Sequence, residues 1–173
     1  MIRLALLTAL GLSAPPLVAQ EADWTGFTFG AEVGAGTIGN LGGDDAAQTY
    51  GLRAGYARDL GDVVLGARIV YDRIEVPGLA DTENHYTALH LTAGYDLGRW
   101  QPYVIGGFAS LTFRTPAPRR SDRGWLAGLG TAYALTDHDI LSVEAIHHFN
   151  DDFHDDGVDR SGTFLTLAYD YRF

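Results

Sequence analysis

Five ionisable residues stand out because each interrupts a stretch that is otherwise built from apolar and small residues. They are Glu32, Arg53, Arg68, His90 and Glu144. A charge in apolar surroundings is stable only when it is paired, so we expect these carboxylate, guanidinium and imidazole groups to meet in the folded chain. Two functions are compatible with such a group: a structural salt-bridge network, or a polar path that ions could follow.

The adjacent residues His147 and His148 are metal ligands by residue type. Neighbouring residues of a strand point to opposite faces, however, so the two imidazoles cannot bind one ion. The acidic stretch 151–157 is loosely similar to a calcium-binding loop, but it has a His at a ligand position, and Thr163 stands where a bidentate Glu belongs. We therefore expect no metal site and no cofactor.

Four guanidinium groups lie within ten residues, at Arg114, Arg119, Arg120 and Arg123. Guanidinium groups bind phosphates, so this segment is a candidate phosphate-binding loop, although the same charges would also balance the acidic segment at 150–161. The chain as a whole has 12 basic residues, all Arg, against 22 Asp and Glu, and a net charge of −10. That balance argues against a nucleic-acid-binding surface.

The first residues have the pattern of a secretory signal peptide: a charged start at Arg3, a short apolar run over 4–12, and a Ser-Ala-Pro-Pro breaker. We expect residues 1–22 to be this signal, with an approximate cleavage site, and 23–173 to form one domain. No later segment offers the roughly 20 apolar residues of a transmembrane helix. Cys is absent from the sequence, which excludes disulfides and thiolate chemistry.

Eight stretches alternate apolar and polar residues with the period of a β-strand. In the last of them, Leu165, Leu167 and Tyr169 share one face with Tyr171 and Phe173. In the fifth, we expect Tyr103 and Ile105 on the outward face and Val104 and Phe108 behind them. The predicted strands lie at about 24–36, 49–59, 63–72, 88–97, 103–113, 125–135, 141–149 and 162–173. Tight turns at 59–62, 96–99 and 136–139 alternate with longer loops at 37–48, 74–84, 114–123 and 150–161.

A repeat of one hairpin and one loop is visible in Tyr56, Tyr95, Tyr133 and Tyr171, which are 39, 38 and 38 residues apart. Each is outward-facing and precedes a tight turn or the chain end, so the four mark one rim of a closed sheet. A Tyr ring is apolar while its hydroxyl requires water, which suits the interface of a membrane. We interpret the four as the aromatic girdle on the periplasmic side.

These features predict an eight-stranded antiparallel up-and-down transmembrane β-barrel. Strands of about 11 residues, tilted by about 40°, span the apolar band of an outer membrane. A soluble barrel of the lipocalin type would carry its apolar face inward, whereas here the charges and small residues share one face and the large apolar residues the other. The five ionisable residues Glu32, Arg53, Arg68, His90 and Glu144 would then meet across the lumen.

The Trp24-Thr-Gly-Phe start, the Gly-Tyr pairs at 55–56 and 94–95, and the final Tyr-Arg-Phe resemble the outer-membrane β-barrel family that includes opacity-type surface antigens and small porin-like proteins. The resemblance implies location in the outer membrane, and Phe173 resembles the signal read by the barrel-assembly machinery. Some relatives are lipid A deacylases, but their His-x-Ser spacing is absent around His147, and Ser142 faces inward. We therefore expect no catalytic residue and no enzymatic activity.

Taken together, we expect both termini at the periplasm, four extracellular loops and no peptidoglycan-binding domain after Phe173. The expected role is structural, with surface interactions through the loops and a lumen closed by the salt-bridge network. A narrow channel for small solutes is the alternative, and a lipid A-modifying enzyme is the third candidate. Expected partners are outer-membrane lipid, lipopolysaccharide through the four Arg residues, the assembly machinery, and an unknown extracellular ligand.

Overall fold

The computed structural model describes residues 22–40, 43–76, 83–114, 120–149 and 161–173. Within them it contains eight strands of 11 to 17 residues. The strands are β1 Gly26–Asn40, β2 Gly43–Asp59, β3 Val63–Glu75, β4 Glu83–Tyr95, β5 Trp100–Arg114, β6 Arg120–Ala134, β7 Asp139–Phe149 and β8 Gly162–Arg172. In this part of the chain no helix has the length and apolar character needed to cross a membrane.

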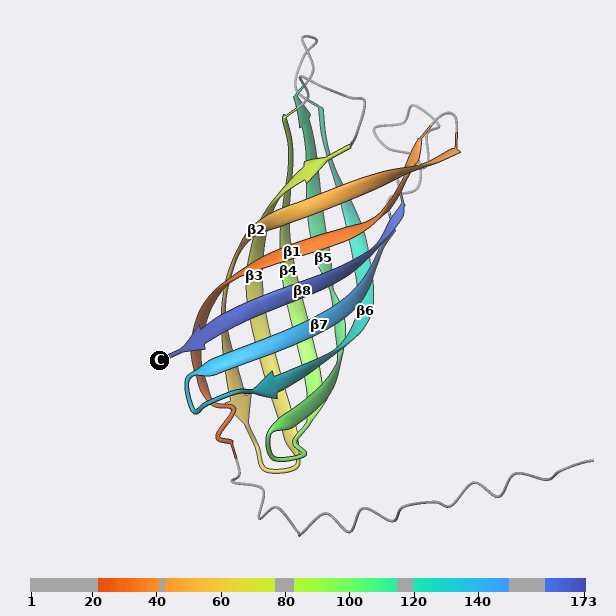
Figure 1. The fold of residues 1–173 in the computed structure, drawn as a ribbon. Coiled ribbons are helices and arrows are strands. Elements are labelled where there is room, and N and C mark those ends of the chain that lie inside the picture. Colours follow the sequence, from red (N-terminus) through yellow and green to blue (C-terminus); the bar gives the residue numbers. More distant parts are fainter. Residues whose placement is uncertain (1–21, 41–42, 77–82, 115–119, 150–160) are drawn as a thin grey trace, which may run out of the picture.

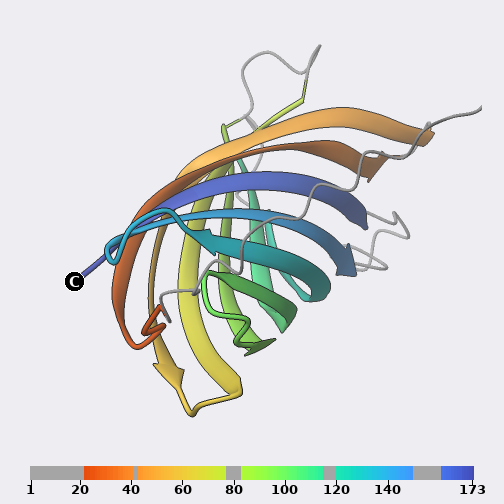
Figure 2. The ribbon, with the colours of Figure 1, turned by 60° about the horizontal axis from the view of Figure 1, so that its bottom comes forward.

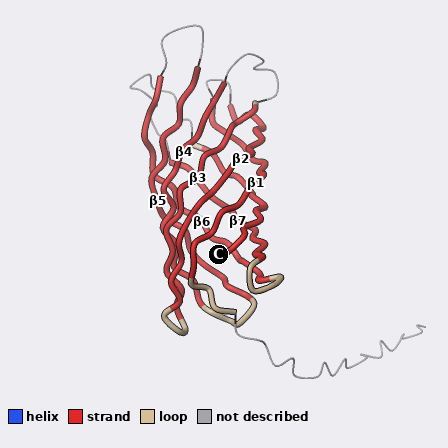
Figure 3. The backbone as a smooth tube through the Cα atoms, turned by 90° about the vertical axis from the view of Figure 1, so that its left-hand side faces the viewer, coloured by secondary structure: helices blue, strands red, loops and turns tan. Residues whose placement is uncertain are grey.

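Each strand pairs with the next in antiparallel fashion, and β1 also pairs with β8, so the sheet closes on itself (Figure 1). Figure 2 presents the barrel obliquely, with the bottom of Figure 1 turned toward the viewer, and Figure 3 shows that the strands are tilted. The predicted eight-stranded up-and-down barrel is confirmed. Closure gives every strand a partner on both sides, which satisfies the backbone groups inside a membrane.

The two ends of the barrel differ in their connections. At the turn end, where the chain also terminates, residues 60–62, 96–99 and 135–138 join the strands (Figure 1). At the loop end, the strands run into residues 41–42, 77–82, 115–119 and 150–160. Two of the tight turns share one device: carboxylates of Asp59 and Asp96 accept hydrogen bonds from the backbone N–H of Gly61 and Gly98 at 2.8 and 2.7 Å. Both glycines have positive φ angles, 100° and 75°, which favour glycine.

Side chains alternate between the two faces of the wall as the sequence predicts for most strands. In β8, for example, Leu165 is 62% exposed and the next residue, Thr166, is 3% exposed. The outward face carries large apolar side chains around the whole barrel, including Phe29, Ile69 and Leu129. An exposed apolar surface of this extent fits contact with lipid rather than with water.

Strand β5 is the exception, because its predicted faces are inverted. Tyr103 is only 8% exposed and Ile105 is also buried, whereas Val104 is 61% exposed and Phe108 lies outward. The reason lies in the neighbouring strand: Tyr103 pairs with Gly130 of β6, and a Cβ at Gly130 would stand 2.8 Å from the Tyr103 ring. The missing side chain leaves room for the ring inside the barrel.

The first predicted loop, 37–48, is also wrong. The ladder between β1 and β2 continues to the pair Asn40 and Gly43, so only residues 41–42 connect the strands. Gly and Asp favour turns, yet here their backbone groups are held in register by the long paired strands. The third loop shrinks in the same way, since β5 extends to Arg114 and β6 begins at Arg120.

Trp24 closes the turn end from inside. Its indole N–H lies 3.1 Å from both Asp96 Oδ1 and the carbonyl of Gly98, and its ring is buried beneath the Arg172 guanidinium, 6.0 Å from the ring centroid. The segment that carries Trp24 is held by a hydrogen bond from the Thr25 N–H to Asp23, which keeps the pKa of Asp23 below its ordinary value.

Candidate functional site in the barrel lumen

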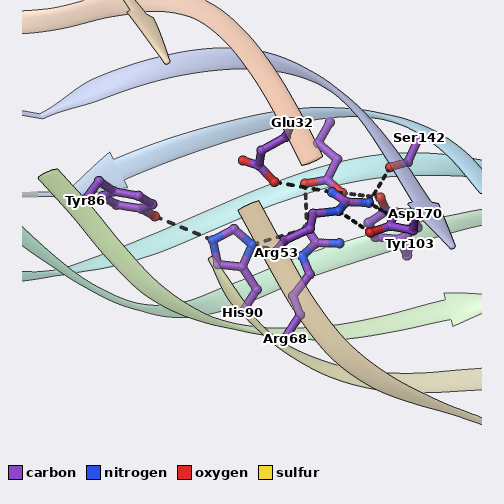
Figure 4. Close-up of polar contacts among 9 residues, drawn as sticks. Glu32, Arg53, Arg68, Tyr86, His90, Tyr103, Ser142 and Asp170 are labelled. Carbon is purple, nitrogen blue, oxygen red and sulfur yellow. Dashed lines mark hydrogen bonds and ion pairs between the residues drawn. The ribbon is translucent and has the colours of Figure 1, made fainter. Parts of the chain in front are cut away.

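A cluster of ionisable and hydroxyl side chains fills the middle of the lumen (Figure 4). We call it the lumen cluster. Its members come from seven strands and are buried or nearly so. The lumen cluster consists of Glu32, Arg53, Arg68, His90, Tyr103, Ser142, Glu144 and Asp170.

Arg53 of β2 is the most connected residue of the cluster. Its guanidinium makes a bidentate pair with Asp170 of β8, with Nε 2.8 Å from Oδ1 and Nη2 bonded to Oδ2. It also donates to Glu144 Oε1 at 3.0 Å and to Ser142 Oγ at 2.7 Å, both on β7. Its Nη1 lies 3.5 Å from Glu32 Oε2. One side chain therefore connects β2 with three other strands through charge-assisted contacts.

Glu144 of β7 accepts from two arginines and a phenol. Besides Arg53, it accepts from Arg68 Nη2 and from the Tyr103 hydroxyl, each at 2.5 Å. The Arg68 guanidinium lies 5.9 Å from the centroid of the Tyr103 ring, a cation–π distance. The Glu144 side chain has no exposed surface, so all compensation for its buried charge comes from these three partners.

A chain of hydrogen bonds leads from the cluster toward the loop end. Arg68 Nε donates to His90 Nδ1 at 3.3 Å, so the imidazole proton lies on Nε2. That nitrogen faces the Tyr86 hydroxyl at 3.5 Å, and the hydroxyl is 3.2 Å from His148 Nδ1. The rings of Tyr86 and His148 also meet edge to face at 4.8 Å.

Glycine on an intervening strand is what lets cluster members meet. Arg53 and Asp170 both pair with Gly30, which lies between them on β1, and a Cβ there would stand 2.3 Å from Asp170 Oδ1. Tyr103 and Glu144 likewise flank Gly130 on β6. Side chains two strands apart are normally separated by the residue between them, so these contacts require a residue without a side chain there.

Small cavities adjoin the lumen cluster on each side. The cavity toward the turn end has a volume of about 80 Å³ and is lined by Trp24, Gln101 and Ile140 together with cluster residues. The cavity toward the loop end has a volume of about 50 Å³ and is lined by Glu32, His90 and a set of apolar residues. A volume of about 10–15 Å³ holds one water molecule, so each cavity has room for only a few.

All five charged residues predicted from the sequence lie together in the cluster. Three further members were not predicted as such: Tyr103, Ser142 and Asp170. Tyr86, which lies beside the cluster, was not predicted either. Ser142 and Asp170 did fall on the predicted inward face, and their partner Arg53 was known from the sequence, so a search for carboxylates on the same face would have found Asp170. Tyr103 was missed because the faces of β5 were inverted.

The four predicted girdle tyrosines lie on the outward face near the turn end, as expected, and three have aromatic neighbours. Ring centroids are 4.8 Å apart for Tyr56 and Phe27, 4.7 Å for Tyr133 and Trp100, and 5.1 Å for Tyr171 and Phe173. The side chain of Tyr95 is half exposed. Phe173 is exposed, and its backbone N–H donates to the carbonyl of Phe27 at 2.9 Å, which fastens the chain end to β1.

Of the four candidate phosphate-binding arginines, three lie in strands rather than in a loop. Arg114 ends β5 and Arg120 begins β6, whereas Arg123 lies within β6 with an exposed side chain. Arg119 lies outside the described residues, as does the acidic stretch 151–157 that was compared with a calcium loop.

His147 and His148 point to opposite faces, as predicted. His147 faces outward, where its Nδ1 lies 2.8 Å from the Thr163 hydroxyl and its ring packs on Phe149. His148 faces the lumen and contacts Tyr86. The nitrogen of His147 that a catalytic carboxylate would orient is therefore occupied by a threonine.

Comparison with known proteins agrees with this architecture. No curated protein matches the chain. The barrel is similar to the crystal structure of Neisserial surface protein A, with a TM-score of 0.65 and 15% identity over 86% of this chain and 98% of that one. It is also similar to Ail of Yersinia pestis (TM-score 0.58, 14% identity, 86% and 99% covered) and to the N-terminal β-barrel domain of OprF of Pseudomonas aeruginosa (0.56, 16%, 83% and 97%). At such identities the likeness concerns the fold alone.

The family described as "Outer membrane protein beta-barrel domain" matches residues 4–173, almost the whole chain. This match, the closed eight-stranded barrel and its apolar outward face agree on the location of the protein. The chain belongs to the outer membrane protein β-barrel family and resides in the outer membrane.

Proposed function

We propose that the protein is a structural barrel of the outer membrane whose lumen is closed and whose interactions take place at its loop end, outside the cell. In this orientation the turn end, with the four girdle tyrosines, faces the periplasm. Catalysis is not part of the proposal, since His147 contacts a threonine and Ser142 is bonded to Arg53 inside the lumen.

The observation that carries the proposal is the lumen cluster itself. Arg53 and Arg68 reach across the barrel from β2 and β3 to carboxylates on β7 and β8, so ion pairs cross the bore at mid-height. An eight-stranded barrel has an interior that side chains roughly fill. An ion could pass only if several buried, charge-assisted hydrogen bonds broke together.

A narrow channel is the second candidate, and the two cavities favour it. They lie on opposite sides of the lumen cluster, so the cluster is the barrier between them. If the pairs of Arg68 opened transiently, the cavities would join. The closed and conducting forms would then differ only in these contacts.

Partners are proposed from chemistry and position. The apolar outward face would contact lipid, and arginines at the loop end of β5 and β6, such as Arg123, would bind lipopolysaccharide phosphates. Phe173, at the exposed end of β8, is the proposed signal for the barrel-assembly machinery. A further ligand outside the cell would be recognised by the loop end.

The decisive experiment is single-channel recording of the refolded protein in a planar bilayer. We expect no discrete current steps from protein shown to be inserted. A channel would give steps, and Glu144→Gln, which preserves size but removes a lumen charge, would change their amplitude. The matched variant is Glu75→Gln, which removes an exposed carboxylate at the loop end of β3.

A further inference from the structure

The cavity between the lumen cluster and the loop end has two kinds of lining. Toward the cluster it is lined by Glu32, Asp72 and His90, whereas Ile38, Ile74 and Phe164 surround it nearer the loop end. Its volume is about 50 Å³. It therefore combines an acidic floor with apolar walls, in a space that suits a molecule of only a few heavy atoms.

The two carboxylates of the floor meet across a glycine. Glu32 on β1 and Asp72 on β3 both pair with Gly51 of β2, and a Cβ at Gly51 would stand 2.1 Å from Asp72 Oδ1. The two carboxyl groups lie within hydrogen-bonding reach of each other. A hydrogen bond between them requires a proton on one carboxyl group, and Glu32 Oε2 and Asp72 Oδ1 are buried without a hydrogen-bond donor. Both residues are only 4% exposed.

The charges around this pair do not balance. The arginines Arg53 and Arg68 face four buried carboxyl groups, which leaves two negative charges in excess when all four are ionised. Asp170 and Glu144 take the short contacts with the arginines, whereas Glu32 reaches Arg53 only at 3.5 Å. The excess charge therefore belongs to the Glu32–Asp72 pair, and a buried carboxyl pair is stable only when a shared proton or a bound positive charge neutralises it.

We propose that this cavity binds the ammonium group of a small primary amine, with Glu32 and Asp72 as hydrogen-bond acceptors and the apolar walls around its carbon atoms. An ammonium group carries three N–H donors, enough to satisfy both orphaned oxygens. Tyr86 also lines the cavity, and an aromatic ring can attract a cation to its face. A metal ion is a poorer fit, because the described residues contain no group of three or more His, Cys, Asp or Glu placed to hold one.

The site can be tested with n-propylammonium chloride and the full-length barrel refolded in detergent, by isothermal titration calorimetry. The matched probes are 1-propanol, which lacks the charge, and tetramethylammonium, which lacks N–H donors. We expect saturable binding of n-propylammonium, and at least tenfold weaker binding of both other probes. Glu32→Gln and Asp72→Asn should each weaken n-propylammonium binding at least tenfold. Glu75→Gln, which alters an exposed carboxylate outside the lumen, should leave binding unchanged.

The conservative variants keep the side-chain volumes, and folding of each is checked by its resistance to unfolding in cold dodecyl sulfate. No binding to the folded wild type would overturn the proposal, and would mean that the pair is neutralised by a proton instead. Equal binding by Glu32→Gln and wild type, or preference for Ca²⁺ over n-propylammonium, would overturn it as well. Channel recording is a separate readout, so a conducting barrel that still binds the amine refutes only the closed lumen.

Discussion

Replacing Glu144 by alanine should strongly destabilise the barrel. The variant removes the acceptor of three hydrogen bonds, from Arg53, Arg68 and Tyr103. Arg53 keeps Asp170, but the ion pair of Arg68 is with Glu144, so a buried guanidinium is left without its carboxylate. Removing one partner of a buried ion pair costs about 3–5 kcal/mol in the free energy of unfolding. The loss of the hydrogen bond from the Tyr103 hydroxyl is included in this figure, because the costs of neighbouring contacts do not simply add.

The matched control is Ser142→Ala, at the neighbouring inward position of the same strand. Ser142 is equally buried, but it contributes one hydrogen bond to Arg53, at 2.7 Å, and Arg53 retains its bidentate partner. We expect a loss of about 1 kcal/mol in the free energy of unfolding. Comparing the two variants separates the loss of a charge from the loss of any buried polar contact.

The assay is equilibrium unfolding in urea, in lipid vesicles, followed by tryptophan fluorescence. Tyr103→Phe tests the same contacts independently. The double variant of Tyr103→Phe and Glu144→Ala should lose less stability than the sum of the losses in the two single variants, because each single variant already removes the hydrogen bond between Tyr103 and Glu144. If Glu144→Ala and Ser142→Ala lowered the free energy of unfolding equally, Glu144 would not compensate the two guanidinium charges, and the reasoning behind the closed lumen would fail.

Three further predictions concern other parts of the barrel. Gly30→Ala should prevent refolding or lower the free energy of unfolding in urea by several kcal/mol, since its Cβ would stand 2.2 Å from the Tyr169 carbonyl oxygen. The control is Gly106→Ala, whose Cβ would have nothing within 4 Å and which should change this free energy by less than about 0.5 kcal/mol. Trp24→Phe removes an indole N–H with two acceptors and should cost about 1–2 kcal/mol by the same assay. Deleting Phe173 should lower the amount of protein in the outer membrane of cells several-fold while leaving refolding in detergent intact; equal loss in both would show a structural role instead.

The number of strands and their order could be predicted from the sequence because the outward face must be apolar along every strand. This requirement produces an alternation of apolar and other residues that can be recognised in each strand without knowing which strands lie beside it. It failed for β5, where both alternating sets contain apolar residues and Gly106 and Gly107 interrupt each of them. There the face is decided by the neighbouring strand, through the space at Gly130, and such information is not present in the strand's own sequence.

The cluster could be predicted as a set of residues but not as a network. Sequence alternation places Arg53 and Asp170 inside the barrel, yet their contact depends on the register of β1 between them, which brings Gly30 opposite both. Register follows from pairing along entire strands, and a shift of two residues would preserve every face while separating the pair. The extension of β1 and β2 beyond the predicted loop has the same origin.

Stability alone does not account for charges in the lumen, since an apolar core of equal volume is often as stable as a buried ion network. A membrane barrel has a further requirement: its two faces must be distinguishable. An apolar lumen would resemble the lipid face, and a slip of one residue in a strand would then cost little. With Arg53 on β2 and Glu144 on β7, the same slip turns a charge toward lipid and breaks its ion pair. Exposing an arginine to lipid at the bilayer midplane costs about 2–4 kcal/mol of stability, and exposing a carboxylate costs less. We infer that the lumen cluster fixes which face of these strands is inside, and that β5, which contributes no charge, takes its face from β6.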